Sequence, residues 1–201
     1  MKFVLPLLVG MAGIALIGAA RPIVSFEEPP VDPVAVQVMA VYAQCVVARD
    51  PAEARTLLAA DYTTDAYKKA VRTFALSHRD CVPRGGKLRF NQIVFAGDMA
   101  EAVMKRQGVT AQQIEQKASV DHVDTMPRCV IKEKAGDVWA LLASKPASRD
   151  EQGRLAALQD TQTICAPKDK VVAANPVAMR ARLALATYRL LNDPAPTSAG
   201  N

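Results

Sequence analysis

The residues of this sequence most able to do chemistry are its four cysteines, Cys45, Cys81, Cys129 and Cys165. Their thiols could bind a metal ion, exchange electrons or form disulfides. No two cysteines are closer than 36 residues, and none has a histidine at the spacing of a zinc site. An even, widely spaced set is typical of disulfides in an oxidising compartment. We therefore expect disulfides, and neither a metal ion nor any other cofactor.

The spacing of the cysteines also indicates an internal repeat. One shift of 84 residues superposes both pairs, and residues 45–105 then lie over 129–189 without a gap. Apolar residues stand opposite apolar ones, and ten positions are identical: Cys45/Cys129, Val46/Val130, Leu57/Leu141, Leu58/Leu142, Ala59/Ala143, Cys81/Cys165, Pro83/Pro167, Asn91/Asn175, Ala100/Ala184 and Ala102/Ala186. We infer two copies of one helical module.

The repeat predicts how the cysteines pair. Four cysteines allow three sets of disulfides, and a module that closes its own loop would join Cys45 to Cys81 and Cys129 to Cys165. Each loop of 36 residues would stabilise the fold by about 4 kcal/mol in the chain-entropy model. Modules of this size have small cores, so a covalent link in each is expected.

Other side chains are candidates for a functional site. His78 lies three residues before Cys81, where it could act as a general base or simply fill space beside the disulfide. Asp98 and Glu101 are the one carboxylate pair near the repeated apolar residues, but their counterparts Arg182 and Leu185 are not acidic. Paired-carboxylate catalysis is therefore not a repeated feature.

Basic residues follow the second cysteine of each module. They are candidate anion-binding residues, or else solvated loop residues that keep the protein soluble: Arg84, Lys87, Arg89, Lys168 and Lys170. The only tryptophan, Trp139, stands opposite Arg55 and is a candidate interface residue, packing between the modules or touching a partner. A net charge of +5 over 201 residues is too weak to predict nucleic-acid binding.

The elements that position these residues are predicted to be helices. Val34, Val38, Val41 and Cys45 recur at helical spacing and predict one buried stripe. Further helices are predicted to begin at Asp50-Pro51, at Thr64 or Asp65, and at Asp98, with an irregular segment over 87–95. In the second half, helices are expected over 136–144, 149–163 and 176–191.

The first twenty residues are typical of a signal peptide. Lys2 gives a positive start, an uncharged apolar run follows, and Gly18-Ala19-Ala20 suits cleavage after Ala20. An uncleaved anchor is the alternative, because 18 apolar residues can just span a bilayer. Together with the disulfides, the leader predicts a periplasmic or secreted protein that meets the membrane only before cleavage.

These features predict an all-α fold, a duplicated and disulfide-linked helical repeat whose two lobes pack as one unit. The expected order is a signal peptide (1–20), a Pro-rich linker (21–33), the first repeat (34–106), a polar linker (107–128), the second repeat (129–191) and a disordered tail (192–201).

The pattern of Cys, Leu-Leu, Cys-x-Pro and then Gly97-Asp98-Met99-Ala100-Glu101-Ala102 resembles a group of exported alphaproteobacterial proteins that carry it once or twice. The resemblance covers both repeat cores and implies export, but it brings no activity, cofactor or catalytic residue. In the second copy, Ala181-Arg182-Leu183-Ala184 replaces the stretch that begins with glycine.

The function expected from the sequence is binding rather than catalysis. No Gly-x-Ser-x-Gly elbow, phosphate-binding glycine loop, His-Glu-x-x-His motif or Cys-x-x-Cys pair is present. We expect a non-enzymatic envelope protein that binds an unknown envelope component or protein through the groove between its lobes or through its basic loops. Two alternatives stay open: a hydrolase or transferase acting on envelope material with His78 as its ionisable centre, and a carrier with an apolar cavity lined by Phe74, Met99 and Met104.

Overall fold

The computed structural model describes residues 32–62, 64–82, 91–120, 125–167 and 175–192, and within these ranges every regular element is a helix. The helices are α1 (Pro33–Arg49), α2 (Pro51–Ala59), α3 (Asp65–Ser77), the short 3-10 helix η1 (Arg79–Cys81), α4 (Gln92–Arg106), α5 (Ala111–Ser119), α6 (Met126–Ala143), α7 (Arg149–Ala157), α8 (Gln159–Cys165) and α9 (Pro176–Asn192). The predicted all-α class is confirmed.

The two disulfides have the predicted pairing. Cys45 bonds Cys81 with an S–S distance of 2.04 Å, and Cys129 bonds Cys165 with a distance of 1.95 Å. The first bond ties α1 to η1, and the second ties α6 to the end of α8. Each module is therefore closed by its own covalent link.

Equivalent residues of the two modules also begin and end equivalent helices. The Thr64 hydroxyl caps α3 by accepting from the backbone N–H of Tyr67, and Ser148, 84 residues later, caps α7 in the same way. Asn91 and Asn175 each accept the N–H two residues on, at 2.9 Å, where α4 and α9 begin. The correspondence under the 84-residue shift thus extends from sequence to helix boundaries.

A break in the helix recurs at the same place in each module. In the first, Asp50 separates α1 from α2 with φ −134° and ψ 72°, and its side chain caps α2, as predicted. In the second, Lys134 is the equivalent residue and carries φ −142° and ψ 43° inside α6. The kink in α6 is therefore the counterpart of the α1–α2 junction.

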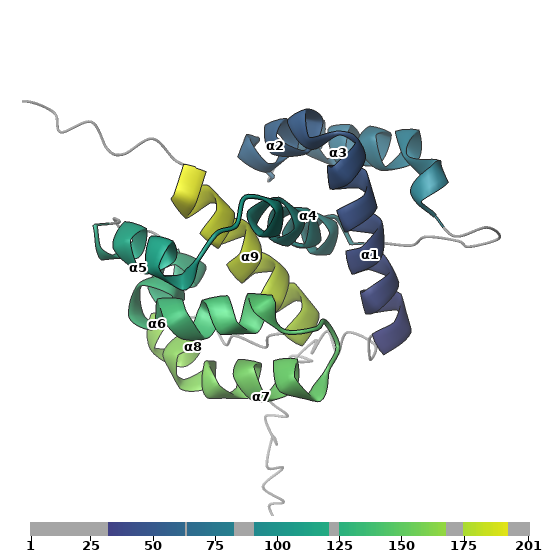
Figure 1. The fold of residues 1–201 in the computed structure, drawn as a ribbon. Coiled ribbons are helices and arrows are strands. Elements are labelled where there is room, and N and C mark those ends of the chain that lie inside the picture. Colours follow the sequence, from purple (N-terminus) through teal and green to yellow (C-terminus); the bar gives the residue numbers. More distant parts are fainter. Residues whose placement is uncertain (1–31, 63, 83–90, 121–124, 168–174, 193–201) are drawn as a thin grey trace, which may run out of the picture.

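The modules meet where α4 crosses α9. Figure 1 shows these two helices at the centre, with α1 to α3 on one side and α5 to α8 on the other. At the crossing, a Cβ built on Gly97 would lie 2.4 Å from the Cα of Ala181, which is the equivalent residue of the second module. The absence of a side chain at Gly97 allows this close approach, and one buried core cluster runs through both modules.

Some elements differ from the sequence-based expectations. α4 begins at Gln92, six residues before the predicted start, because Asn91 supplies the cap. The predicted helix over 149–163 is divided at Leu158 into α7 and α8. The stretch 107–128, predicted as a polar linker with at most one weak helix, contains α5, which begins with a capping box formed by Thr110 and Gln113.

The predicted buried stripe of α1 is wrong. Val34 and Val41 are 66% and 63% exposed, and the buried residues of this helix are Val36, Met39, Tyr42, Ala43, Val46 and Val47. The helix is apolar on most sides, so helical spacing alone did not determine which side faces α4. Tyr42 settles the orientation: its hydroxyl donates to the Ala75 carbonyl at 2.7 Å, and its ring packs against Phe95.

Several predicted segments lie outside the described residues. These are the signal peptide, all but the end of the Pro-rich linker, all but the start of the C-terminal tail, and the two basic loops. Among the helices in the described ranges, none is both long enough and apolar enough to cross a bilayer.

Candidate functional site

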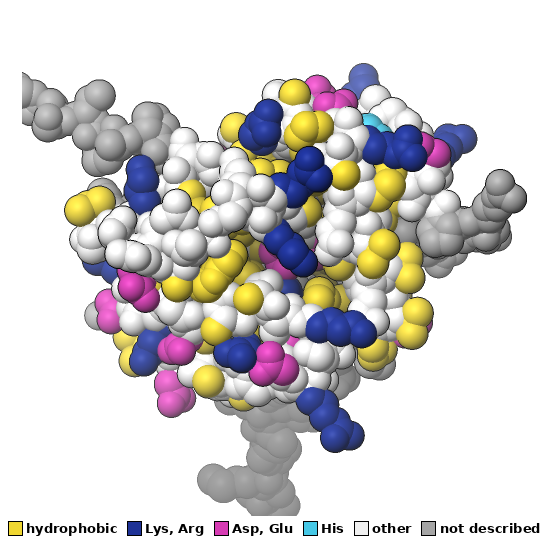
Figure 2. Space-filling view, in the orientation of Figure 1, with side chains coloured by type: hydrophobic (Ala, Val, Ile, Leu, Met, Phe, Trp, Pro, Cys, Tyr) yellow, Lys and Arg dark blue, Asp and Glu magenta, His cyan; other side chains and the backbone are white. Residues whose placement is uncertain are grey.

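The described residues do not include the predicted anion-binding positions. Arg84, Lys87, Arg89, Lys168 and Lys170 all fall in ranges 83–90 and 168–174, which lie outside them. Trp139 lies on α6, is partly buried and packs against the core cluster. On the face drawn in Figure 2, lysine and arginine side chains are spread widely rather than gathered in one patch.

His78 closes the C-terminal end of α3. Its Nδ1 lies 2.9 Å from the Phe74 carbonyl oxygen and 3.1 Å from the Ser77 hydroxyl oxygen. The imidazole also packs edge-on against the Phe74 ring at 4.7 Å between centroids, and the neighbouring Ser77 hydroxyl donates to the same carbonyl. These contacts are those of a residue that ends a helix, and they give a catalytic base no support.

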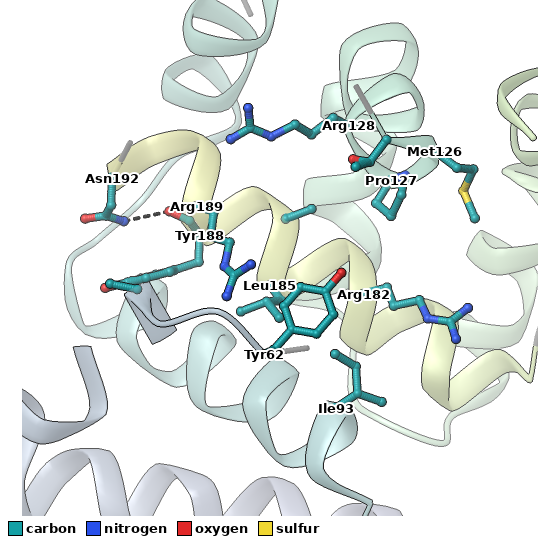
Figure 3. A pocket seen from close by; sticks show the side chains of 13 residues that line it. Tyr62, Ile93, Met126, Pro127, Arg128, Arg182, Leu185, Tyr188, Arg189 and Asn192 are labelled. Atoms are coloured by element: carbon teal, nitrogen blue, oxygen red, sulfur yellow. Dashed lines mark hydrogen bonds between the residues drawn. The ribbon is translucent and has the colours of Figure 1, made fainter. Parts of the chain in front are cut away.

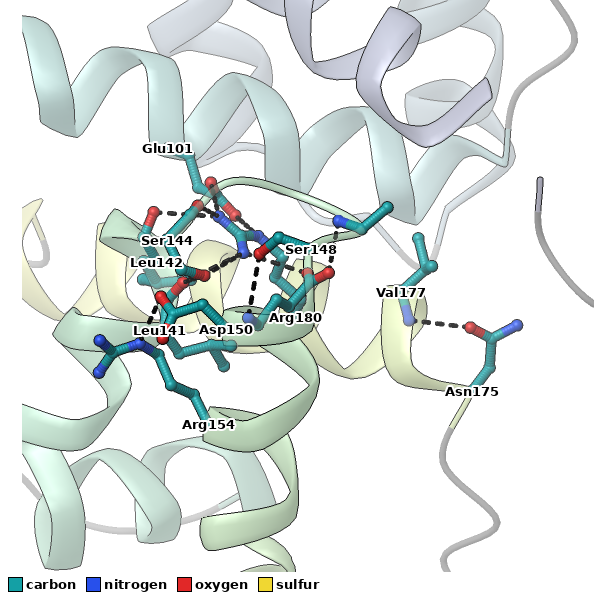
Figure 4. Close-up of polar contacts among 12 residues, drawn as sticks. Glu101, Leu141, Leu142, Ser144, Ser148, Asp150, Arg154, Asn175, Val177 and Arg180 are labelled. Atoms are coloured by element: carbon teal, nitrogen blue, oxygen red, sulfur yellow. Dashed lines mark hydrogen bonds and ion pairs between the residues drawn. The ribbon is translucent and has the colours of Figure 1, made fainter. Parts of the chain in front are cut away.

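Glu101, one of the two carboxylates noted in the sequence, belongs to a buried ion network (Figure 4). Arg180 of α9 donates from Nε and Nη2 to the two oxygens of Glu101 on α4, both at 2.7 Å. Its Nη1 donates to Glu151 at the start of α7, at 3.1 Å. Arg180 is 3% exposed and Glu151 5%, so these charges are almost fully removed from water.

The same guanidinium closes the end of α6. It donates to the carbonyls of Leu141, Leu142 and Ser144, each at 3.0 Å. Every N–H of the Arg180 side chain thus has an acceptor, and four helices, α4, α6, α7 and α9, are joined at one point. Burying an ion pair is costly unless its hydrogen bonds are satisfied, and here they are, so this network is a structural one.

Asp98 lies beside this network on α4 and is 9% exposed. One of its oxygens, Oδ2, has no hydrogen-bond partner among the described residues. Burial, with a smaller contribution from the nearby Glu101 carboxylate, holds the pKa of Asp98 well above its usual value of 3.8. Asp98 is therefore a buried carboxylic acid that favours its neutral form.

A pocket of about 650 Å³ lies between the two modules. The first module contributes Ala59, Tyr62 and Ile93, and the rest of the lining comes from the N-terminus of α6 and from α9: Thr125, Met126, Pro127, Arg128, Arg182, Leu185, Ala186, Tyr188, Arg189 and Asn192. Figure 3 shows the Tyr62 ring at its centre, with Arg128 and Arg182 projecting in opposite directions. Among the described residues that line the pocket, three are arginines and none is acidic.

Arg189 holds the wall of this pocket in place. Its Nε donates to the Leu58 carbonyl at 3.2 Å and its Nη2 to the Ala60 carbonyl at 2.5 Å. The guanidinium also lies 4.8 Å from the centre of the Tyr62 ring, a cation–π contact. In the described part of the chain, no carboxylate is paired with this partly buried charge.

A second pocket of about 390 Å³ shares Tyr62 and Ile93 with the first and is also lined by Tyr67. Tyr67 is 4% exposed, and its hydroxyl has no hydrogen-bond partner among the described residues. Burial raises the pKa of Tyr67, while the charge of Arg189 acts in the opposite direction. A buried hydroxyl therefore lines a cavity next to a cation, and in the described part of the chain neither the hydroxyl has a hydrogen-bond partner nor the cation a carboxylate.

Sequence reasoning expected a groove between the lobes but missed the ion network and the residues that line the pocket. The signal was available where the repeat breaks down: Arg180 stands opposite Ala96, Glu101 opposite Leu185, and Glu151 opposite Tyr67. Charged residues opposite apolar ones mark the places where the two halves differ in function or packing. The apolar cavity predicted around Phe74, Met99 and Met104 is instead core, since all three are buried in one cluster.

Comparisons with known proteins give no independent identification, because no family model, curated protein or solved structure matches this chain. Within the described ranges, no group of three His, Cys, Asp or Glu side chains is placed to hold a metal ion. Fold and site together define an all-α, disulfide-linked tandem repeat with a basic pocket between its halves.

Proposed function

We propose that this is an exported, non-enzymatic protein of the cell envelope that acts by binding a small ligand in the pocket between its two modules. The observation that carries the proposal is the pocket itself, since about 650 Å³ falls in the range of small-molecule sites. Both modules build it, as expected for a groove between lobes. Its apolar wall, with Ile93, Met126 and Leu185, suits a ligand with a hydrocarbon part.

Two observations support a periplasmic or secreted location. The two disulfides fit an oxidising environment, and the leader has the sequence of a cleavable signal peptide. We infer from this location, and not from any residue of the pocket, that the ligand comes from the cell envelope.

Binding of an uncharged apolar fluorophore, N-phenylnaphthylamine, tests the proposal on the mature protein secreted with its own leader, whose intact mass should show that it begins at Arg21. We expect the fluorescence to rise on binding, because the probe leaves water for an apolar site. Ala186→Trp fills the pocket and should abolish this rise. Ala156→Trp is the matched control, since Ala156 is exposed on α7 away from the pocket, and it should bind as the wild type does.

Equal fluorescence in both tryptophan variants, or no rise in the wild type, would contradict the proposed pocket. A chain that keeps residues 1–20 in the mature protein would contradict the proposed cleavage.

A further inference from the structure

In both modules an arginine side chain donates hydrogen bonds to the carbonyls at the same helix end. In the second module, Arg180 donates to the carbonyls of Leu142 and Ser144. In the first, Arg189 donates to the carbonyls of Leu58 and Ala60, which are the same positions 84 residues earlier. An arginine of α9 therefore closes the equivalent helix end in both halves.

The anions around the two arginines are not equivalent. Arg180 is neutralised by Glu101 and Glu151. The residues that correspond to these carboxylates are Leu185 and Tyr67, which line the pockets beside Arg189. The first module thus keeps the cation but has an apolar side chain and a phenol where the second has its two carboxylates.

In the described part of the first module, no carboxylate takes the place of Glu101 and Glu151. Arg189 is partly buried without a carboxylate partner among the described residues, and Tyr67 offers a buried hydroxyl that could donate to one. Arg182, exposed at the edge of the same pocket with no partner in the described ranges, adds a second positive charge. A partly buried cation gains most from an anion that reaches it out of water.

We propose that the pocket binds an amphipathic organic anion, whose carboxylate or phosphate group occupies the place that Glu101 and Glu151 fill in the other module. The anionic group pairs with Arg189 and accepts a hydrogen bond from the Tyr67 hydroxyl, and Arg182 adds positive charge at the rim of the pocket. The hydrocarbon part lies against Ile93, Met126 and Leu185. This inference rests on the proposed function and adds the chemical class of the ligand.

Displacement of N-phenylnaphthylamine by dodecanoate, dodecyl phosphate and the neutral dodecanol tests the charge preference. We expect each anion to bind at least tenfold more tightly than dodecanol, as a charge-assisted hydrogen bond predicts. The stronger of the two anions identifies a carboxylate or a phosphate ligand. Equal displacement by dodecanol and both anions would overturn the anion inference while leaving the proposed binding function intact, whereas a fluorophore that never binds would overturn both.

Two pairs of variants locate the anion. Leu185→Glu installs an internal carboxylate one helical turn before Arg189 and should remove the preference for anions over dodecanol, while the neutral Leu185→Gln should keep it. Arg182→Gln should weaken dodecanoate binding about threefold or more without changing dodecanol binding, and Arg149→Gln, at an exposed arginine of α7, should change neither. An anion preference that survives both Leu185→Glu and Arg182→Gln would overturn the assignment, and Arg182→Gln carries the test if Leu185→Glu does not fold.

Discussion

At the scale of single residues, burial decides what each ionisable group does. Arg180 and Glu101 are charged and buried, and they are stable there because every donor of Arg180 has an acceptor. Asp98, on the same helix as Glu101, forms no ion pair in the described ranges, and its Oδ2 has no hydrogen-bond partner there. The neutral acid is consequently the form of Asp98 that the folded protein tolerates.

The pH dependence of stability tests this assignment for Asp98. Because its pKa is raised on folding, the folded state binds a proton more tightly than the unfolded chain, so Asp98 lowers the stability progressively as the pH rises above 3.8. The loss is complete once the pH exceeds the raised folded-state pKa. Asp98→Asn removes this titration, so across a titration from about pH 4 to about pH 8 its free energy of unfolding relative to the wild type should improve until the pH passes the raised folded-state pKa of Asp98. Urea unfolding of both proteins across that range measures the difference, and a constant difference would contradict a raised pKa.

At the scale of helices, local signals set the boundaries and packing sets the orientations. The caps at Asp50 and Thr64 were predictable, because a cap is a contact between residues two or three positions apart. The predicted start of α9 at 176 is also observed, and there the Asn175 side chain accepts the backbone N–H of Val177. The equivalent start of α4 was missed, because Asn91 is followed by Gln92 rather than by a proline. The repeat alone could have predicted this start, since Asn91 is the counterpart of Asn175.

Substitution of Gly97 tests the crossing of α4 and α9. Alanine normally stabilises the middle of a helix relative to glycine, but a Cβ at Gly97 would lie 2.4 Å from the Ala181 backbone. Gly97→Ala should therefore lower the free energy of unfolding by about 1–3 kcal/mol, the usual cost of overpacking. Gly153→Ala on α7 is the matched control, because nothing lies within 4 Å of its Cβ position, and it should raise stability by about 0.5–1 kcal/mol. Thermal or urea unfolding compares the two, and a Gly97→Ala protein as stable as the wild type would contradict the close crossing.

At the scale of the whole molecule, the two modules share one core. α4 and α9 belong to different modules, yet their buried residues form a single cluster with those of α1, α2 and α6. Neither module can lose its structure without exposing the core of the other. Unfolding should for this reason be one cooperative transition rather than two.

Removal of the first disulfide tests this coupling from the opposite module. Cys81→Ser leaves Cys45 as a free thiol and should lower stability by about 2–4 kcal/mol. The only tryptophan, Trp139, lies in the second module, so its fluorescence reports on the half that keeps its disulfide. We expect the midpoint of the Trp139 transition in urea to fall with that of the helical circular dichroism signal. An unchanged Trp139 midpoint would show that the modules unfold separately, and a Cys45 that resists thiol labelling would contradict the pairing.

The sequence by itself determined the all-helical class, the two modules and both disulfides. These follow from the spacing of residues and from caps formed between near neighbours in the sequence. Only the tertiary structure decided which side of α1 is buried, and that Arg180, Glu101 and Glu151, from three different helices, meet while Arg189 has no carboxylate partner in the described part of the chain. Such contacts join residues as far as 79 positions apart and depend on how α4 crosses α9. Gly97 permits that crossing because it has no side chain, and its close contact is with Ala181 on another helix rather than with a neighbour in the sequence.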